Sequence, residues 1–87
     1  MSFEFDAEKS APNKKRHSIG LVEAQALWND PLLIVAPARS DDEERFLAVG
    51  CIGMKHWSAV HALREDRIRL ISVRRSRPQE VEYYEGE

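Results

Sequence analysis

The stretch Arg67–Tyr84, RIRLISVRRSRPQEVEYY, decides the fold, because it combines a strand signal, a helix start and a dense basic cluster. Its first part alternates apolar and arginine side chains, which predicts a strand over Arg67–Arg74. One face of that strand would carry Ile68, Leu70 and Ser72, and the other Arg69, Ile71 and Val73. The rest of the chain is interpreted as the support of this segment.

A helix is predicted directly after the strand, beginning at Ser76. Ser76 provides an N-cap hydroxyl, Pro78 falls in the first turn where its missing N–H costs little, and Gln79 completes a capping box. A strand that brings Arg74 to a helix N-terminus, an end rich in N–H donors, is a candidate phosphate site. The alternative is an ordinary strand-to-helix corner with solvated arginines.

Length and composition predict one domain over residues 1–87 with a modest core. The chain is 43% hydrophobic and 32% charged, as expected of a globular domain or of one half of a stable complex. No apolar run approaches the roughly 18 to 20 residues of a membrane span, and the first residues are acidic where a signal peptide would be basic. These features predict a cytoplasmic protein. The single cysteine, Cys51, is interpreted as a small core residue.

The net charge of −2 argues against a protein that binds nucleic acid by bulk electrostatics. The basic residues are nevertheless clustered, and a local basic surface would form if the fold brought the clusters together. The first cluster is Lys14, Lys15, Arg16 and His17, and the second is Arg64, Arg67, Arg69, Arg74, Arg75 and Arg77.

The N-terminal part of the chain predicts one strand and two helices. Phe3–Phe5 is a candidate strand, followed by a helix over Ala7–His17 that Asp6 can cap and that should kink or restart near Pro12. Gly20, with Glu23 three residues later, can begin a second helix. That helix is predicted over Leu21–Trp28, from the spacing of its apolar residues, and Asn29-Asp30-Pro31 ends it.

Four strands are predicted after the second helix: Leu32–Ala36, Arg45–Ile52, His56–Leu63 and Arg67–Arg74. The polar segment 37–44 is expected to be a loop, and short turns join the later strands. Strands joined in this way predict an antiparallel meander whose face is covered by helices. The expected fold class is α+β, in the order βααββββα.

The residue types limit the kinds of active site that this chain can form. The three histidines, His17, His56 and His61, show no metal-ligand spacing, no serine lies in a glycine-flanked elbow, and the four glycines form no phosphate loop. No metal or cofactor is therefore predicted. The remaining candidates are basic and phenolic side chains.

Cleavage of RNA by its own 2′-hydroxyl needs a base, an acid and cations, and no metal. Candidates are His61 on its strand, Arg74 at a strand end, His17 or Lys15 at a helix end, and Tyr83 or Tyr84 on the last helix. The alternative for His61 is a core residue, because it shares a strand face with apolar side chains. Tyr84 can likewise be a packing residue.

An ordered set of short motifs spans nearly the whole chain. It consists of Asp6-x-x-Lys9-x-x-x-Asn13-x-x-x-His17, Glu23-Ala24, Asp30-Pro31, Glu44-Arg45-Phe46, Gly50, Arg69-x-Ile71-Ser72-x-Arg74 and Glu80-x-x-Tyr83-Tyr84. In order and spacing this set resembles the BrnT toxins. The resemblance implies a ribonuclease toxin of a type II toxin–antitoxin pair with a fold similar to the RelE superfamily. Its partner would be a BrnA-like ribbon-helix-helix antitoxin, and operator DNA would be bound only through that antitoxin.

The family pattern marks Lys9, Asn13, His17, Arg45, Arg74, Glu80 and Tyr84, and the resemblance implies RNA cleavage by basic residues in place of a metal. Together with the residue chemistry, it gives as catalytic candidates Arg74, His61, His17, Tyr84 and Glu80. The RNA-binding candidates are Lys9, Lys15, Arg45, Arg69, Arg75 and Arg77. The alternative function is a non-enzymatic or weakened interaction module, retained for complex formation and operon autoregulation, because the small core suggests that a partner contributes buried surface.

Overall fold

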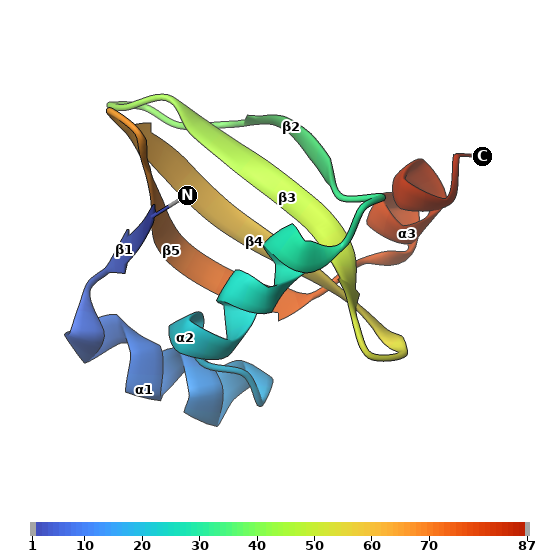
Figure 1. Cartoon of the computed structure of the whole chain (residues 1–87), viewed down its shortest axis with the longest axis horizontal. Coiled ribbons are helices and arrows are strands. Elements are labelled where there is room, and N and C mark those ends of the chain that lie inside the picture. Colours follow the sequence, from blue (N-terminus) through green and yellow to red (C-terminus); the bar gives the residue numbers. More distant parts are fainter. Residues whose placement is uncertain (1, 87) are drawn as a thin grey trace.

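The computed structural model describes residues 2–86, which form one sheet with helices packed against it (Figure 1). The strands are β1 (Ser2–Phe5), β2 (Ile34–Ala38), β3 (Arg45–Ile52), β4 (Lys55–Arg64) and β5 (Arg67–Arg75). Met1 and Glu87, the end residues of the predicted domain, lie outside the described residues. No helix within residues 2–86 is both long enough and apolar enough to cross a membrane.

The sheet has five strands in the spatial order β1-β5-β4-β3-β2 and is mixed. Neighbouring strands from β2 to β5 pair antiparallel, but β1 pairs parallel with β5, from Ser2 opposite Arg67 to Phe5 opposite Leu70. The α+β class is confirmed, and the four strands β2 to β5 form the predicted antiparallel meander. The parallel addition of β1, which makes the sheet mixed, was not predicted. The four-residue β1 pairs with a strand more than sixty positions away, and no local pattern reveals such a partner.

Helix α1 (Ala7–His17) begins as predicted, since the Asp6 carboxylate accepts the backbone N–H of Glu8 at 2.9 Å. The predicted alternative of a restart near Pro12 is wrong, because one helix runs through this position. The reason is tertiary: Asn13, the next residue, is buried and hydrogen-bonded to both Ile19 and β5. These contacts hold the helix at the position where Pro12 removes a backbone bond.

The second helix begins after Gly20, whose N–H donates to Glu23 Oε1 at 2.9 Å, as the sequence predicts. It is divided, however, into a short α2 (Leu21–Ala24) and a 3₁₀ helix η1 (Gln25–Asn29). The buried residues Leu21, Ala24 and Leu27 are spaced by three. A 3₁₀ turn has three residues, so this spacing keeps Ala24 and Leu27 in line toward the sheet.

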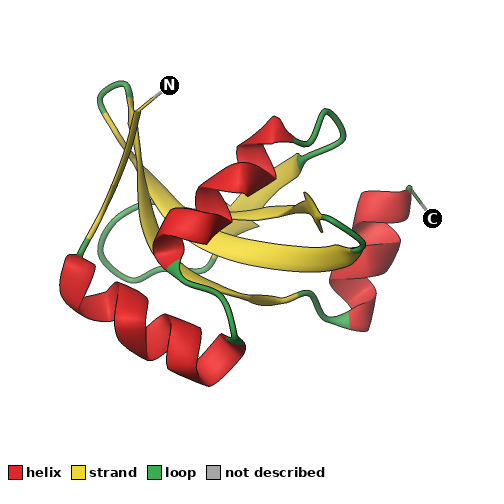
Figure 2. Ribbon diagram, turned by 60° about the horizontal axis from the view of Figure 1, so that its bottom comes forward, coloured by secondary structure: helices red, strands yellow, loops and turns green. Residues whose placement is uncertain are grey.

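The core lies between one face of the sheet and the layer formed by α1, α2 and η1 (Figures 1 and 2). Fully buried side chains include Leu21, Leu27, Leu70 and Val73, and burying each leucine contributes about 1.5–3 kcal/mol. At Gly50 a Cβ atom would lie 2.9 Å from Leu33 Cδ1. Glycine is favoured there because the side chains of Leu33, Asp30 and Leu27 fill the space that a Cβ atom would need.

The strand boundaries differ from the prediction by one or two residues in β1, β2, β4 and β5. β3 has the predicted bounds, but β2 covers Ile34–Ala38 instead of Leu32–Ala36 and therefore includes Pro37, which was assigned to a loop. Pro37 is tolerated because β2 is an edge strand, and a residue without an N–H breaks no ladder on the open side.

A β-bulge in β5 changes which side chains face the core. Val60 pairs with Ser72 and His61 with Leu70, so Ile71 is an extra residue in β5. Ile68 and Leu70 face the core, and after the bulge Val73 does as well. The prediction placed Ser72 on the face of Leu70 and Val73 on the other face. From the bulge onward this assignment is wrong, because Val73 shares the core face with Leu70 and Ser72 lies on the other face. The bulge turns Ser72 and Arg74 to the side of the sheet away from α2.

Helix α3 (Pro78–Glu85) lies at the end of the sheet away from β1 (Figure 1). Its N-cap is Arg77 and not the predicted Ser76, and Glu80, not Gln79, makes the return bond to the N-cap N–H at 2.9 Å. Pro78 is the first helical residue, where proline is preferred. Ser76 instead lies 2.8 Å, hydroxyl to hydroxyl, from Ser58.

Candidate functional site

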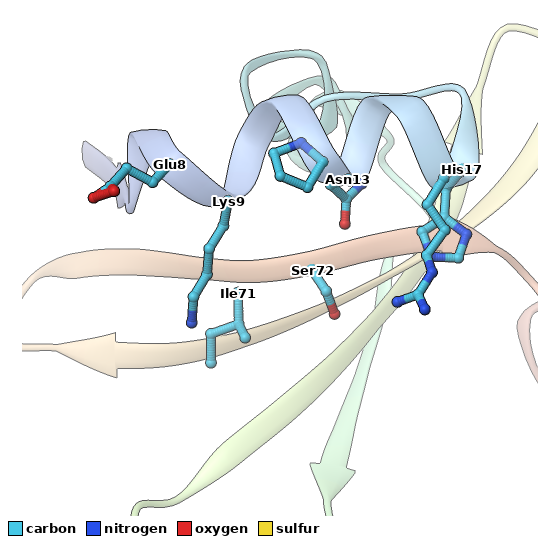
Figure 3. Close-up of a pocket in the computed structure, with 8 residues that line it drawn as sticks. Glu8, Lys9, Asn13, His17, Ile71 and Ser72 are labelled. Atoms are coloured by element: carbon cyan, nitrogen blue, oxygen red, sulfur yellow. The ribbon is translucent and has the colours of Figure 1, made fainter.

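A groove of about 420 Å³ runs between α1 and the outer edge of β5 (Figure 3). It forms because β1 stops pairing with β5 after Leu70, so the rest of β5 faces a helix instead of a strand. The groove is lined by Glu8, Lys9, Pro12, Asn13, Arg16 and His17 from α1 and by Ile71 and Ser72 from β5.

Lys9, Asn13 and His17 follow one another at intervals of four and so share one side of α1. Figure 3 shows their side chains directed toward β5, where Ile71 and Ser72 lie. Lys9 is exposed, His17 is half-buried and Asn13 is buried. The groove thus presents a lysine and a histidine on either side of a buried amide.

The basic groove residues are not neutralised by carboxylates. Within residues 2–86, Lys9 and Arg16 form no ion pair, whereas their neighbour Lys14 binds Glu23 at 3.3 Å on another side of the helix. The one acidic residue of the lining is Glu8. The charge of Lys9 and Arg16 is therefore available to an anion that enters the groove.

A second polar cluster joins β4, β5 and α3. Arg74 and Glu80 form two parallel hydrogen bonds of 2.8 Å, from Nη1 to Oε1 and from Nη2 to Oε2. Glu80 Oε1 also accepts from Ser58 Oγ at 2.8 Å and from the backbone N–H of Arg77 at 2.9 Å. The side chains of Arg74 and Glu80 are only 25% and 16% exposed, so the pair is largely shielded from water.

The pair changes the proton affinity of both groups. The hydrogen bonds from Arg74, with smaller contributions from Arg77 and Ser58, hold the pKa of Glu80 at about 2, and the bond to Glu80 raises the pKa of Arg74. Both groups are consequently charged at neutral pH. A carboxylate of such low pKa is a poor proton acceptor under these conditions.

Arg74 keeps hydrogen-bonding capacity beyond this pair. A guanidinium has five N–H donors. The bonds to Glu80 and to the Arg75 carbonyl use three of them within the described part of the chain. Ser72 in the groove lies two residues before Arg74 and on the same side of β5, so Arg74 is the next side chain along that side of the strand.

His61, a catalytic candidate, lies in the core at 2% exposure and outside the groove. Its ring contacts Trp28 edge-on at 5.1 Å and stacks with Phe46 at 5.8 Å between centroids. Nδ1 is buried and has no hydrogen-bond partner within residues 2–86. Burial lowers the pKa of His61, which keeps the ring neutral.

Tyr84, another catalytic candidate, fixes the far end of α3. Its hydroxyl donates to Asp30 Oδ2 at 2.7 Å, and the same oxygen accepts the backbone N–H of Cys51 at 2.8 Å. The bond to Asp30, together with desolvation and Cys51, raises the pKa of Tyr84. His56 packs edge-on against the Tyr84 ring and its Nε2 lies 3.0 Å from Glu85.

The predicted RNA-binding residues are dispersed, and of these only Lys9 lines the groove. Lys15 is exposed on α1 outside the lining, and Arg77 is the N-cap of α3. Arg69 binds Glu4 at 2.8 Å, which lowers the pKa of that carboxyl. Arg75 lies 5.4 Å above the Trp57 ring, and the buried Nε of Arg45 has no hydrogen-bond partner among the described residues.

Sequence reasoning missed Arg16 and Ser72 as lining residues and Ser58 as a partner of Glu80. Arg16 was visible only as a member of a basic cluster. Ser72 belongs to a family motif, but the strand pattern placed it on the wrong face, because the bulge decides which way it points. Ser58 carries no local signal, because strand register decides its direction. Within residues 2–86, no group of three or more His, Cys, Asp or Glu side chains gathers in a way that could hold a metal ion.

The fold and site define a small α+β protein with two polar regions along β5. One is a groove whose Lys9 and Arg16 form no ion pair within residues 2–86, and the other is a carboxylate-bound arginine, Arg74. Residues 5–80 match the family model described as the ribonuclease toxin BrnT of type II toxin–antitoxin systems. The chain therefore belongs to the BrnT toxin family, as its sequence motifs predict. No curated protein matches the chain. Membership of a type II family implies an antitoxin partner.

Proposed function

We propose that this chain is a single-domain, cytoplasmic ribonuclease toxin with a RelE-like fold that cleaves RNA without a metal ion. The proposal is supported by family membership and by one observation above all, the groove that Lys9, Arg16 and His17 line together with Ser72 of β5. Arg74 is outside the lining and follows two residues after Ser72 on the same strand. Basic side chains without carboxylate partners are suited to hold a phosphodiester.

The proposed reaction is internal transfer at phosphorus. A base removes the proton of the 2′-hydroxyl, the 2′-oxygen forms a bond to phosphorus, and the bond from phosphorus to the 5′-oxygen breaks. The leaving 5′-oxygen takes a proton from water. The products are a 2′,3′-cyclic phosphate and a 5′-hydroxyl, so no atom is supplied by a cofactor.

His17 is assigned as the base, because it is the histidine that lines the groove and imidazole exchanges protons near neutral pH. Glu80 is unsuited to this role, since its pKa of about 2 makes it a weak base. Tyr84 is engaged with Asp30 and its pKa is raised. We assign Glu80 and Tyr84 to positioning, and His61 to the core.

Arg74 is assigned to the charge that builds on phosphorus, through the two donors that Glu80 and Arg75 leave unused. Lys9 and Arg16 would bind the phosphates that flank the scissile one. Arg75 follows Arg74 in the chain and Arg77 is the N-cap of α3, and both are proposed to contact RNA that extends from the groove toward α3. Arg45 and Arg69 are retained as contacts for a longer RNA.

The proposed partner is a BrnA-like ribbon-helix-helix antitoxin, which would also provide the contacts to operator DNA. The net charge of −2 supports this division of labour, because a chain without excess positive charge is a poor independent DNA binder. The second candidate function is a non-catalytic module that only forms this complex. The observation in its favour is that Glu80 occupies both terminal nitrogens of Arg74.

The test is induced expression of the wild-type chain in a bacterial host, with growth and total RNA integrity followed over time. Growth arrest with RNA loss is expected from the wild type and not from Arg74→Ala, because the variant lacks the charge that stabilises the transition state. Arg39→Ala is the matched control, since it removes an exposed arginine outside the groove. Normal growth with abundant folded wild-type protein would instead establish the non-catalytic module.

Cleavage of a synthetic RNA by the purified chain tests the chemistry. A 5′-hydroxyl on the product and undiminished activity in EDTA are expected. A 5′-phosphate product, or loss of activity that Mg²⁺ restores, would overturn the metal-independent mechanism.

A further inference from the structure

Within residues 2–86, the section of β5 that follows Leu70 has no partner strand on its outer side. Pairing with β1 ends at Phe5 opposite Leu70. Ser72 and Arg74 lie beyond that point, in the section that forms the groove floor and leads to α3. Without a partner, the outer backbone groups of this section would be left to water and its position would be loosely set.

Asn13 takes the place of the missing strand at Val73. Its Oδ1 accepts the Val73 N–H at 3.1 Å, and its Nδ2 donates to the Val73 carbonyl at 3.0 Å. A second Nδ2 hydrogen bond of 2.7 Å reaches the carbonyl of Ile19. The amide therefore uses both of its donor hydrogens and its oxygen, and at 9% exposure it is nearly sealed from water.

The position of Asn13 links the two halves of the proposed site. Along α1 it lies one turn from Lys9 and one turn from His17. On β5 it binds Val73, the residue between Ser72 and Arg74. One side chain consequently fixes the helix that carries the proposed base against the strand that carries the proposed arginine.

We propose that Asn13 is a positioning residue of the RNA-cleavage reaction, which sets the separation between His17 on α1 and Arg74 on β5 through its paired hydrogen bonds to Val73. This inference rests on the proposed function. Because displacement of a reacting group by about 1 Å costs on the order of 100-fold in rate, Asn13→Ala should lower kcat by that order. KM for RNA should change less than about threefold, because Lys9 and Arg16 are untouched.

The experiment measures kcat and KM of the full chain on a synthetic single-stranded RNA, well below the unfolding temperature of each variant. Ser10→Ala is the matched control, because it removes a hydrogen bond from the same helix, to the Leu21 N–H, without touching β5. It should leave kcat within about twofold of the wild type. Should Asn13→Ala be unfolded at the assay temperature, Asn13→Asp carries the test, since it keeps an acceptor for Val73 N–H and loses both donors.

A double-variant cycle separates positioning from general support. If Asn13 acts on the distance between His17 and Arg74, its loss should cost less than about fivefold once Arg74→Ala has removed one of the two groups. Full additivity of the two losses overturns the proposal, and so does an Asn13→Ala enzyme with the wild-type kcat. A wild-type chain that cleaves no RNA overturns the proposed function, and with it the role of Asn13 in cleavage.

Discussion

The two polar regions beside β5 differ in whether their basic side chains are paired with carboxylates. In the groove, Lys9 and Arg16 form no ion pair within residues 2–86. At the start of α3, Arg74 is bound to Glu80 by two hydrogen bonds of 2.8 Å, and Glu80 accepts two further bonds. The groove cations are thus unpaired within residues 2–86, whereas the corner, formed by Arg74 and Glu80, holds its charges in a network of hydrogen bonds.

This difference indicates which residues are available to bind a ligand and which ones stabilise the fold. Uncompensated surface charges contribute little to stability and are available to a ligand, whereas a shielded, multiply bonded pair holds elements together. Loss of a groove residue should therefore affect activity, and loss of Glu80 should affect stability. Arg74 is common to both regions in the proposed mechanism, because the bonds to Glu80 orient it and it projects from the side of β5 that carries Ser72.

The largest effect is expected for the groove histidine. His17→Ala should lower RNA cleavage by about 10²- to 10⁴-fold, the range of general acid–base catalysis, with little change in stability. Initial rates on a synthetic RNA measure it. His56→Ala is the matched control, since His56 lies beside α3 with Glu85 and Tyr84. Equal losses in the two variants would contradict the assignment of His17.

Glu80→Gln should have the next largest effect, on stability and its pH dependence. The pKa of Glu80 falls from 4.5 to about 2 in the folded chain, so its ionised form contributes roughly 3 kcal/mol above pH 4.5. That contribution is lost as the pH falls from 4.5 toward 2. The free energy of unfolding of the wild type should decline over this range, and that of Glu80→Gln should be lower at pH 7 and decline less.

Urea unfolding at several pH values measures this prediction, with Glu82→Gln as the control. Glu82 is exposed on the same helix, so its replacement should leave the pH profile unchanged. If the free energy of unfolding has the same pH dependence in Glu80→Gln and in the wild type, the ionised Glu80 side chain does not stabilise the fold.

His61→Phe should produce a smaller effect of the opposite sign. Burial lowers the pKa of His61 from 6.5, so the unfolded chain binds a proton more readily and the wild type loses stability as the pH falls below 6.5. A phenyl ring between Trp28 and Phe46 removes this loss. Relative to the wild type, the variant should therefore become more stable as the pH is lowered from 8 to 5.5.

Chemical unfolding at the two pH values tests this gain, and RNA cleavage should persist in His61→Phe. A variant that is folded but inactive would return His61 to the catalytic residues. The result thus decides whether His61 is only a core residue or also takes part in RNA cleavage.

The smallest effect is expected for single groove cations. Lys9→Ala should raise KM for RNA a few-fold and reduce the magnitude of the salt slope of binding by about 0.7, the value for one phosphate contact on a single strand. Lys15→Ala on the same helix lies outside the groove lining and should change neither. Binding titrations at several salt concentrations measure both. An equal change in KM and salt slope for Lys15→Ala would show that RNA contacts are not confined to the groove side of α1.

Local patterns predicted the elements but not how they meet. β3 has its predicted bounds, and the capping of α1 by Asp6 and of α2 by Gly20 and Glu23 is confirmed, because each depends on residues close in sequence. The continuity of α1 through Pro12 was missed, since it depends on bonds from Asn13 to Ile19 and Val73. The same holds for the candidate site. Lys9 and His17 were identified in the chain, whereas Ser72 was not.

The sequence by itself determined the α+β class, the family and the residue types of the site, because periodicity, caps and motif spacing are written in neighbouring residues. The tertiary structure decided the parallel pairing of β1 with β5, the bulge at Ile71 and the burial of His61. These features depend on contacts between distant residues and on strand register, in which one extra residue turns the side chains that follow to the other face. The tertiary structure therefore also decided which of the predicted residues lie together beside β5.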